Sequence, residues 1–285
     1  MYIKQPTITN IVGFKVGMAH IGMTDDTESP SKNLEVSRAC TLVEIPKTQI
    51  YGARFYGKDE TSRYKKTIAE SAPHEKEALG KFRQRLGEFC DITALLVANV
   101  KDTSTGQHHH VRYESSLGGA KIEDKFEFMV SNLSKQLGPT EVFKPGEYID
   151  VASVTTGKGW QGTIKRFGTA RLYHKATQKT RHVGTLGPFT PGKVLFTVPQ
   201  AGQTGFNYRT EYNKRILKIG SKNDTGAMTP KSGFKNYGIM NNDFVVLDGS
   251  VPGPSRRLVR LRKSVTDRNH GAVKEPKLLY ASMAT

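Results

Sequence analysis

A run of sixty residues without an acidic side chain constrains this sequence more than any other feature. Val151–Thr210 contains no Asp and no Glu, and the first acidic residue after Asp150 is Glu211. Extended to Gly220, the window holds twelve Lys and Arg residues against one acidic residue, and so carries +11 of the formal net charge of +17. Cations at this density repel one another unless anions lie among them, so the stretch predicts a polyanionic partner.

The central part of this stretch, Gly157–Lys193, has no pattern that would let it fold alone. Its 37 residues include ten apolar side chains, spread without a period, and eight basic ones. Such a composition buries too little apolar surface to offset the entropy of ordering the chain. We therefore expect an extended arm without regular structure, which leaves the folded body and becomes ordered on an anionic partner.

The composition of the whole chain narrows the choice of partner and compartment. A length of 285 residues allows a sizeable core, and a pI near 9.8 ranks nucleic acid before anionic membrane as the partner. The longest apolar run, Ile92–Val100, is far shorter than the ~20 residues of a spanning helix. Met1–Phe14 does not resemble a secretory signal, and Cys40 and Cys90 are too few for a disulfide scaffold. We expect a cytoplasmic protein.

Short strand-like runs lie near both ends of the sequence. In Arg38–Ile45, alternate residues would line opposite faces of a strand. The other strand candidates are Ile11–Ile21, which we expect to turn at Gly13 and Gly17, and Tyr148–Thr155, Val194–Pro199, Arg215–Ile219, Phe244–Leu247 and Arg257–Leu261. Short strands at this spacing predict a mainly β fold built on a small barrel.

The region between these strand groups has a different pattern. Pro73–Phe89 has helical spacing, Asp91–Val100 resembles a buried strand, and Lys121–Leu137 carries an apolar stripe that Gly138 and Pro139 should end. Helices interleaved with a strand suggest an α/β insertion. We therefore expect residues 1–54 and 141–285 to form the barrel, residues 55–140 to form the insertion, and the arm to span 157–193.

Gly157–Gly162 matches the pattern G-x-G-x-x-G after a strand-like run. Dinucleotide binding would also need a following helix and an acidic residue roughly 20 positions later, and we expect neither, since no acid occurs before Glu211. A kinase loop would need companion motifs that are missing. A plain flexible turn remains an alternative. We favour glycines that let the backbone approach phosphates while Lys158 neutralises them.

Other candidate sites are weaker. His108–His110 lies in a polar loop without a Cys or carboxylate cluster, which favours a solvated surface over a metal site. Glu123 and Asp124 fit the first turn of a helix better than acid–base catalysis. No triad signature or nucleophile elbow is visible. The sequence predicts no catalytic residue, no cofactor, no metal and no small-molecule substrate.

Aromatic residues alternate with the cations of the arm, and unstacked RNA bases can lie on aromatic or guanidinium planes. Packing against the barrel is the alternative, and we expect it for Phe196 and Phe206. In the C-terminal basic cluster, Val259 and Leu261 should point inward, whereas Arg260 and Arg262 should point outward, to RNA or only to solvent. The predicted RNA-binding residues are Lys15, Lys158, Trp160, Lys165, Arg166, Arg171, Lys175, Lys179, Arg181, His182, Phe189, Lys193, Gln203, Arg209, Lys214, Arg215, Arg256, Arg257, Arg260 and Arg262.

Several blocks, in order, resemble the ribosomal protein L3 family of the large subunit, in its archaeal and eukaryotic form. They are Gly13–Met18 (GFKVGM), Val154–Gly168, Gly187–Pro191, Val198–Thr210 (VPQAGQTGFNYRT) and Gly249–Pro254. The resemblance implies a six-stranded barrel of the type shared with translation factors and a long loop corresponding to Gly157–Lys193. It also implies a non-catalytic protein of the cytoplasmic ribosome that binds 23S-type rRNA beside neighbouring ribosomal proteins.

In this family the protein assembles early, and the loop runs through RNA toward the peptidyl-transferase centre. The resemblance places Phe189 near the tip of that loop, where relatives usually carry Trp. Phenylalanine keeps the ring face but lacks the indole N–H donor. Ala19 stands where Thr is common, and the basic N-terminal tail of relatives is largely absent.

Three rival functions belong to other classes. An rRNA-modifying enzyme would need a cofactor fingerprint or a catalytic carboxylate in the basic region, which has no acid. A general nucleic-acid-coating protein would bind duplex DNA as well as rRNA. A soluble translation factor with the same barrel would normally carry a nucleotide-binding domain, and no signature of one is visible.

Overall fold

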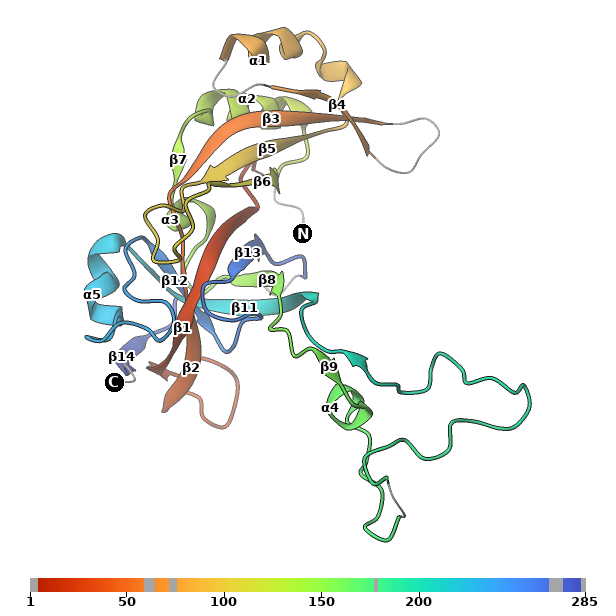
Figure 1. The fold of residues 1–285 in the computed structure, drawn as a ribbon. Helices are drawn as coiled ribbons and strands as arrows, with labels where there is room; N and C mark the ends of the chain where they lie inside the picture. The colour runs from red at the N-terminus through yellow and green to blue at the C-terminus, as the bar shows by residue number, and fades with distance from the viewer. Residues whose placement is uncertain (1–4, 59–64, 72–75, 177–178, 267–273, 283–285) are drawn as a thin grey trace. The chain divides into compact units, whose positions relative to one another are not determined.

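A computed structural model describes residues 5–58, 65–71, 76–176, 179–266 and 274–282 of the chain (Figure 1). The chain is mainly β and divides into two compact units. The first unit comprises Met1–Ser153 and Thr210–Thr285, and the second comprises Val154–Arg209. No helix within the described ranges is long and apolar enough to cross a membrane.

A seven-stranded sheet forms the centre of the first unit. Its order is β13-β8-β11-β12-β2-β1-β14, and β13 also pairs with β1. The strands are β1 Asn10–Thr24, β2 Glu35–Glu44, β8 Tyr148–Val154, β11 Tyr208–Gly220, β12 Phe244–Asp248, β13 Leu258–Lys263 and β14 Leu278–Ser282. The strand predictions at 38–45, 148–155, 215–219, 244–247 and 257–261 are thus confirmed, with β11 longer than expected. The prediction at Val194–Pro199 is wrong, because these residues form loop and turn.

Strand β1 organises the sheet because other strands pair with both of its edges: β2 with one edge, and β13 and β14 with the other. Its first half pairs with β13, from Asn10 with Arg262 to Phe14 with Leu258, and its second half pairs with β14. The expected turns at Gly13 and Gly17 are wrong, since β1 runs through both glycines. Gly13 instead allows close packing, because a Cβ there would lie 2.6 Å from Val43 Cγ1. The register with β2 shifts by one residue between Lys15 and Gly17, as in a β-bulge.

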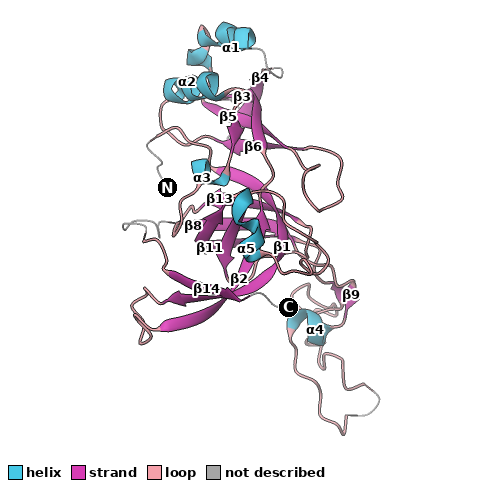
Figure 2. Cartoon of the chain, turned by 90° about the vertical axis from the view of Figure 1, so that its left-hand side faces the viewer, coloured by secondary structure: helices cyan, strands magenta, loops and turns pink. Residues whose placement is uncertain are grey.

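A second, antiparallel sheet has the order β4-β3-β5-β6, with β7 paired to β3. Its strands are β3 Thr48–Lys58, β4 Lys65–Glu70, β5 Asp91–Ala98, β6 Val111–Ser116 and β7 Gln136–Leu137. Helices α1 (Lys76–Arg83) and α2 (Ile122–Asn132) lie beside this sheet (Figure 2). Phe55 of β3 packs against Phe82 of α1 at 4.8 Å and against Phe126 of α2 at 6.4 Å between ring centroids.

Helix α2 is shorter than the apolar stripe predicts. It ends at Asn132, because Ser134 adopts a positive φ of 68° and its amide donates to the Ile50 carbonyl of β3 at 2.9 Å. The chain then forms β7, and Pro139 begins the short helix α3 (Pro139–Val142) instead of stopping α2. The predicted helix at Pro73–Phe89 is α1 followed by a 3-10 turn at Leu86–Glu88, and residues 73–75 of that prediction lie outside the described residues.

One hydrophobic core connects the two sheets. It contains Ile11 of β1, Phe55 of β3, Met129 of α2 and Leu261 of β13, all fully buried. Val259 and Leu261 are both buried while Arg260 is exposed, which confirms the predicted alternation of β13. A second core, around Phe14 and Phe244, lies along the other part of β1. Residues of β1 pack into both cores, which hold this strand in place.

Candidate nucleic-acid interface

The base of the second unit is a short two-stranded ladder. Strand β9 (Trp160–Gln161) pairs with β10 (Gly202–Gln203). The Lys158 amide donates to the Thr204 carbonyl at 2.9 Å, and the Thr204 amide donates to the Gly159 carbonyl at 2.9 Å. Gly205, at φ 73°, lies so close to Thr156 that a Cβ would meet the Thr156 carbonyl oxygen at 2.1 Å. This ladder holds the start of the predicted arm against residues 202–204, which follow its predicted end at Lys193.

Helix α4 (Thr163–Phe167) follows β9 and ends at Gly168, whose φ of 70° is a left-handed C-cap. Arg166 of α4 donates to the Gln200 carbonyl at 2.8 Å, and its guanidinium lies 4.9 Å from the centroid of the Phe167 ring. It also lies directly over Gly202, since a Cβ there would be 2.7 Å from Nη1. The expectation of an arm without regular structure is therefore wrong for residues 160–167.

Residues 168–201 contain no helix or strand in the part that the structure describes, and most of their side chains are exposed. Phe189 is 98% exposed and Phe196 is 99% exposed. The expectation that Phe196 packs against the barrel is therefore wrong. Phe206 is also largely exposed, and a Cβ added to Gly157 would lie 3.4 Å from the Phe206 Cβ at the base of the unit.

The predicted residues of the second unit are all exposed. They are Lys158, Trp160, Lys165, Arg166, Arg171, Lys175, Lys179, Arg181, His182, Phe189, Lys193, Gln203 and Arg209. Val154–Arg209 contains no carboxylate, so none of its cations has an acidic partner within the unit. Because the cations are held apart on an extended chain, the surface presents many separate positive charges to an anion instead of one enclosed site.

The predicted residues of the first unit have a different environment. Arg215 forms an ion pair with Asp26, at 2.6 Å from Nη1 to Oδ1, and Arg262 pairs with Asp150 at 2.9 Å. Lys214 contacts Glu211 at 2.8 Å. These three cations are partly neutralised within the fold. The Asp26 pairing raises the pKa of Arg215 and lowers that of Asp26, chiefly through this hydrogen bond.

Lys15 belongs to the same structural group. Its ammonium donates to the carbonyl oxygens of Val251 at 2.5 Å and Gly253 at 2.9 Å, and burial lowers its pKa. The remaining predicted residues of this unit are more open: Arg256 and Arg260 are exposed, Arg257 is half-buried, and Arg260 donates to the Glu114 carbonyl at 2.8 Å. Within the first unit, the predicted residues therefore divide into cations paired inside the fold and cations that are more open.

Two further observations concern residues outside the predicted RNA-binding set. His108–His110 is exposed, and no group of three or more His, Cys, Asp or Glu within the described ranges could hold a metal ion. Phe234 and Lys235 line a cavity beside β1 that the sequence analysis missed. The cluster Ser232–Asn236 combines turn formers with an aromatic residue and a cation, and that combination was the available signal.

The fold and the charge distribution define a basic, mainly β protein with an exposed, acid-free unit. Comparison with known proteins identifies its family. The family model for ribosomal protein L3 matches residues 84–284. Relatives named large ribosomal subunit protein uL3 include one from Methanothermobacter thermautotrophicus, 37% identical over 99% of this chain and 89% of its own length. Another, from Pyrobaculum aerophilum, is 37% identical over the same shares of the two chains.

The chain belongs to the ribosomal protein L3 family, in its archaeal form. Members of this family are structural proteins of the ribosome and not enzymes. Membership agrees with the resemblance that the sequence blocks carry.

Proposed function

We propose that this chain is a structural component of the large ribosomal subunit in the cytoplasm that binds 23S-type rRNA through Val154–Arg209. In this role it supports early assembly of the subunit and organises rRNA near the peptidyl-transferase centre. Its partners are that rRNA and neighbouring ribosomal proteins. The observation that carries the proposal is the acid-free second unit, whose predicted cations are all exposed.

Phosphate neutralisation is the main source of affinity in this proposal. Each exposed cation that meets a phosphate releases a condensed counterion, which favours binding and makes it depend on salt. A carboxylate among packed phosphates would be repelled by them, which gives a reason for the absence of acid from the whole unit. The exposed rings of Trp160 and Phe189 then supply surfaces for unstacked bases.

The first unit serves as the anchor for this RNA-binding unit. We propose that β1, β2, β12, β11, β8 and β13 form a closed barrel, since each pairs with the next and β13 pairs with β1. Residues 1–47 and 141–285 contribute the barrel, 48–140 the insertion, because β3 pairs within the second sheet, and 157–193 the arm. The pairs Arg215–Asp26 and Arg262–Asp150 stabilise this anchor, whereas Arg256, Arg257 and Arg260 extend the basic surface.

The salt dependence of binding to a large-subunit rRNA transcript tests the proposal. If the arm neutralises about eight phosphates, log affinity should fall against log salt with a slope on the order of −7. Replacing Lys175, Lys179 and Arg181 by Gln should reduce the slope to about −4. A matched variant replaces three exposed lysines of the first unit, Lys32, Lys101 and Lys121, and should leave the slope unchanged. A wild-type slope shallower than about −3, or equal effects of the two triple variants, contradicts the proposal.

A further inference from the structure

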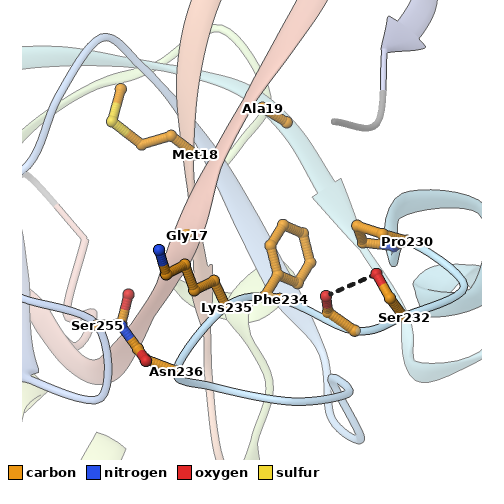
Figure 3. A pocket seen from close by; sticks show the side chains of 10 residues that line it. Gly17, Met18, Ala19, Pro230, Ser232, Phe234, Lys235, Asn236 and Ser255 are labelled. Atoms are coloured by element: carbon orange, nitrogen blue, oxygen red, sulfur yellow. Dashed lines mark hydrogen bonds between the residues drawn. The ribbon is translucent and has the colours of Figure 1, made fainter. Parts of the chain in front are cut away.

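A cavity of about 420 Å³ lies beside β1, outside the acid-free unit. One wall is Gly17–Ala19 of β1, and the other is the loop at residues 230–236, with Ser255 at a third side (Figure 3). The Phe234 ring lies between Lys235 and Ser232, whereas the side chain of Met18 points away from it (Figure 3). The proposed function makes no use of this cavity.

The loop that carries Phe234 is a rigid element. Phe234 and Gly238 exchange backbone hydrogen bonds of 2.8 and 2.9 Å, and Asn236 between them has a positive φ of 63°. The end of the loop is fixed by the buried carboxylate of Glu44, which accepts hydrogen bonds from the Tyr237 hydroxyl and from the Asn241 amide. The ring therefore occupies its place before any ligand arrives, which lowers the entropy lost on binding.

Gly17 allows the ring of Phe234 to lie against the backbone of β1. A Cβ at Gly17 would meet Phe234 Cδ1 at 2.8 Å, so any larger residue would displace the ring. Phe234 remains only half-buried. Its ring thus forms a partly open apolar surface on a polar part of the protein.

The charge around this surface is positive. Among the residues that the structure describes, no carboxylate lines the cavity, and Lys235 is exposed at its edge. Arg256, also exposed, follows the lining residue Ser255, and its backbone amide donates to the Lys15 carbonyl of β1 at 2.8 Å. An apolar ring with cations at its rim matches a nucleotide, which has a flat base and an anionic phosphate.

We propose that this cavity is a second RNA-binding site, which takes one unstacked nucleotide of the rRNA. The base lies against Phe234, and the adjacent phosphates contact Lys235 and Arg256. The proposal rests on the proposed function in that the partner is RNA, but it concerns a surface that contains none of the arm. The rigid loop makes the site selective for unpaired nucleotides, because a base in a helix cannot reach the ring.

Two substitutions test the site in the full-length protein with the large-subunit rRNA transcript. Phe234→Leu keeps an apolar side chain but removes the aromatic plane, so affinity should fall about tenfold without a change in the salt slope. Phe128→Leu is the matched control, because Phe128 is also a half-buried ring packed on a core but lies away from the cavity. Lys235→Gln should reduce the slope by about 1, whereas Lys231→Gln, four residues earlier and outside the cavity lining, should not.

Crosslinking gives an independent readout. Ultraviolet irradiation of the wild-type complex should place a nucleotide adduct between Ser232 and Asn236, and Phe234→Leu should abolish it. If wild-type protein fails to bind the transcript, the proposed function fails. If wild-type protein binds but Phe234→Leu equals Phe128→Leu and no adduct forms there, the arm still binds RNA and the second site is wrong.

Discussion

Arg215 and Asp26 form an ion pair between residues that lie 189 positions apart in the sequence. Only 11% of the Arg215 side chain is exposed, so it serves the fold more than a partner. Its place in a run of basic residues predicted that it binds RNA. A charge pattern shows which cations lack acidic neighbours in the sequence, but it does not show which of them meet an acid in the folded protein. Arg262 and Arg260 of β13 differ in the same way. Arg262 forms an ion pair with Asp150, whereas Arg260 donates to the backbone carbonyl of Glu114 and stays exposed.

Asp26→Asn should lower the free energy of unfolding by about 2 kcal/mol, between the values typical of exposed and fully buried pairs. The pKa of Asp26 is lowered in the folded protein, mainly by the hydrogen bond from Arg215. Its stabilising effect is therefore complete above the unfolded pKa of about 3.9 and is lost as pH falls through the folded value. Urea unfolding should show a constant difference between wild type and variant from about pH 7 to 5, which shrinks below about pH 4.

Glu28→Gln is the matched control for that measurement, because Glu28 is an exposed acid two residues away. Its effect should stay within about 0.5 kcal/mol at every pH. Equal effects of the two substitutions would mean that the pair with Arg215 adds nothing to stability.

At the scale of elements, the ladder at the base of the second unit depends on Gly205. Gly205→Ala should open this ladder, because Ala at φ 73° is strained and its Cβ would collide with the Thr156 carbonyl. Exchange of the Lys158 and Thr204 amides should become at least about tenfold faster, as measured by hydrogen exchange. Gly162→Ala provides the control, since Gly162 has a φ of −69° and no atom near the added Cβ. Unchanged exchange in Gly205→Ala would show that the ladder tolerates the extra methyl group.

The elements that the sequence predicted are those with a regular burial pattern. Val259 and Leu261 alternate with exposed neighbours, and β5 is an apolar run of strand length, so both strands were visible. The end of α2 was not, because Ser134 leaves the helix to pair with Ile50, a contact made far away in sequence. β9 and β10 are two residues each, too short for any periodicity.

The candidate site was predictable to a similar extent. The exposure of the arm cations was predictable, because the unit contains no carboxylate to pair with them and few apolar residues to bury them. The cavity at Phe234 was not predictable, because it requires Gly17 of β1 and a loop more than two hundred residues later to meet. Local composition reports charge and exposure, whereas a cavity is a property of tertiary contacts.

For the whole molecule, the contrast between the two units predicts where proteases act. Limited trypsin digestion of the free protein should cut first between Arg171 and Lys193, where the described residues include exposed cations and form no helix or strand. Cleavage at Arg166 should come later, since its side chain is held by Gln200 and Phe167. Bound rRNA should protect the early sites, and gel analysis over time measures each rate. Equal cleavage of both units in the free protein would contradict this contrast.

Because β1 pairs along both edges, one of its edges stays unpaired while the rest of the chain is synthesised. The partner strand β2 follows β1 at once, but Phe14 meets Leu258 and His20 meets Ser282 only when the end of the chain has been made. At synthesis rates of about 5–20 residues per second, that edge of β1 waits on the order of 10–50 s. An unpaired strand edge is a template for pairing with other chains. The earliest strand of this protein is therefore the last to be completed, and slower translation prolongs its exposure.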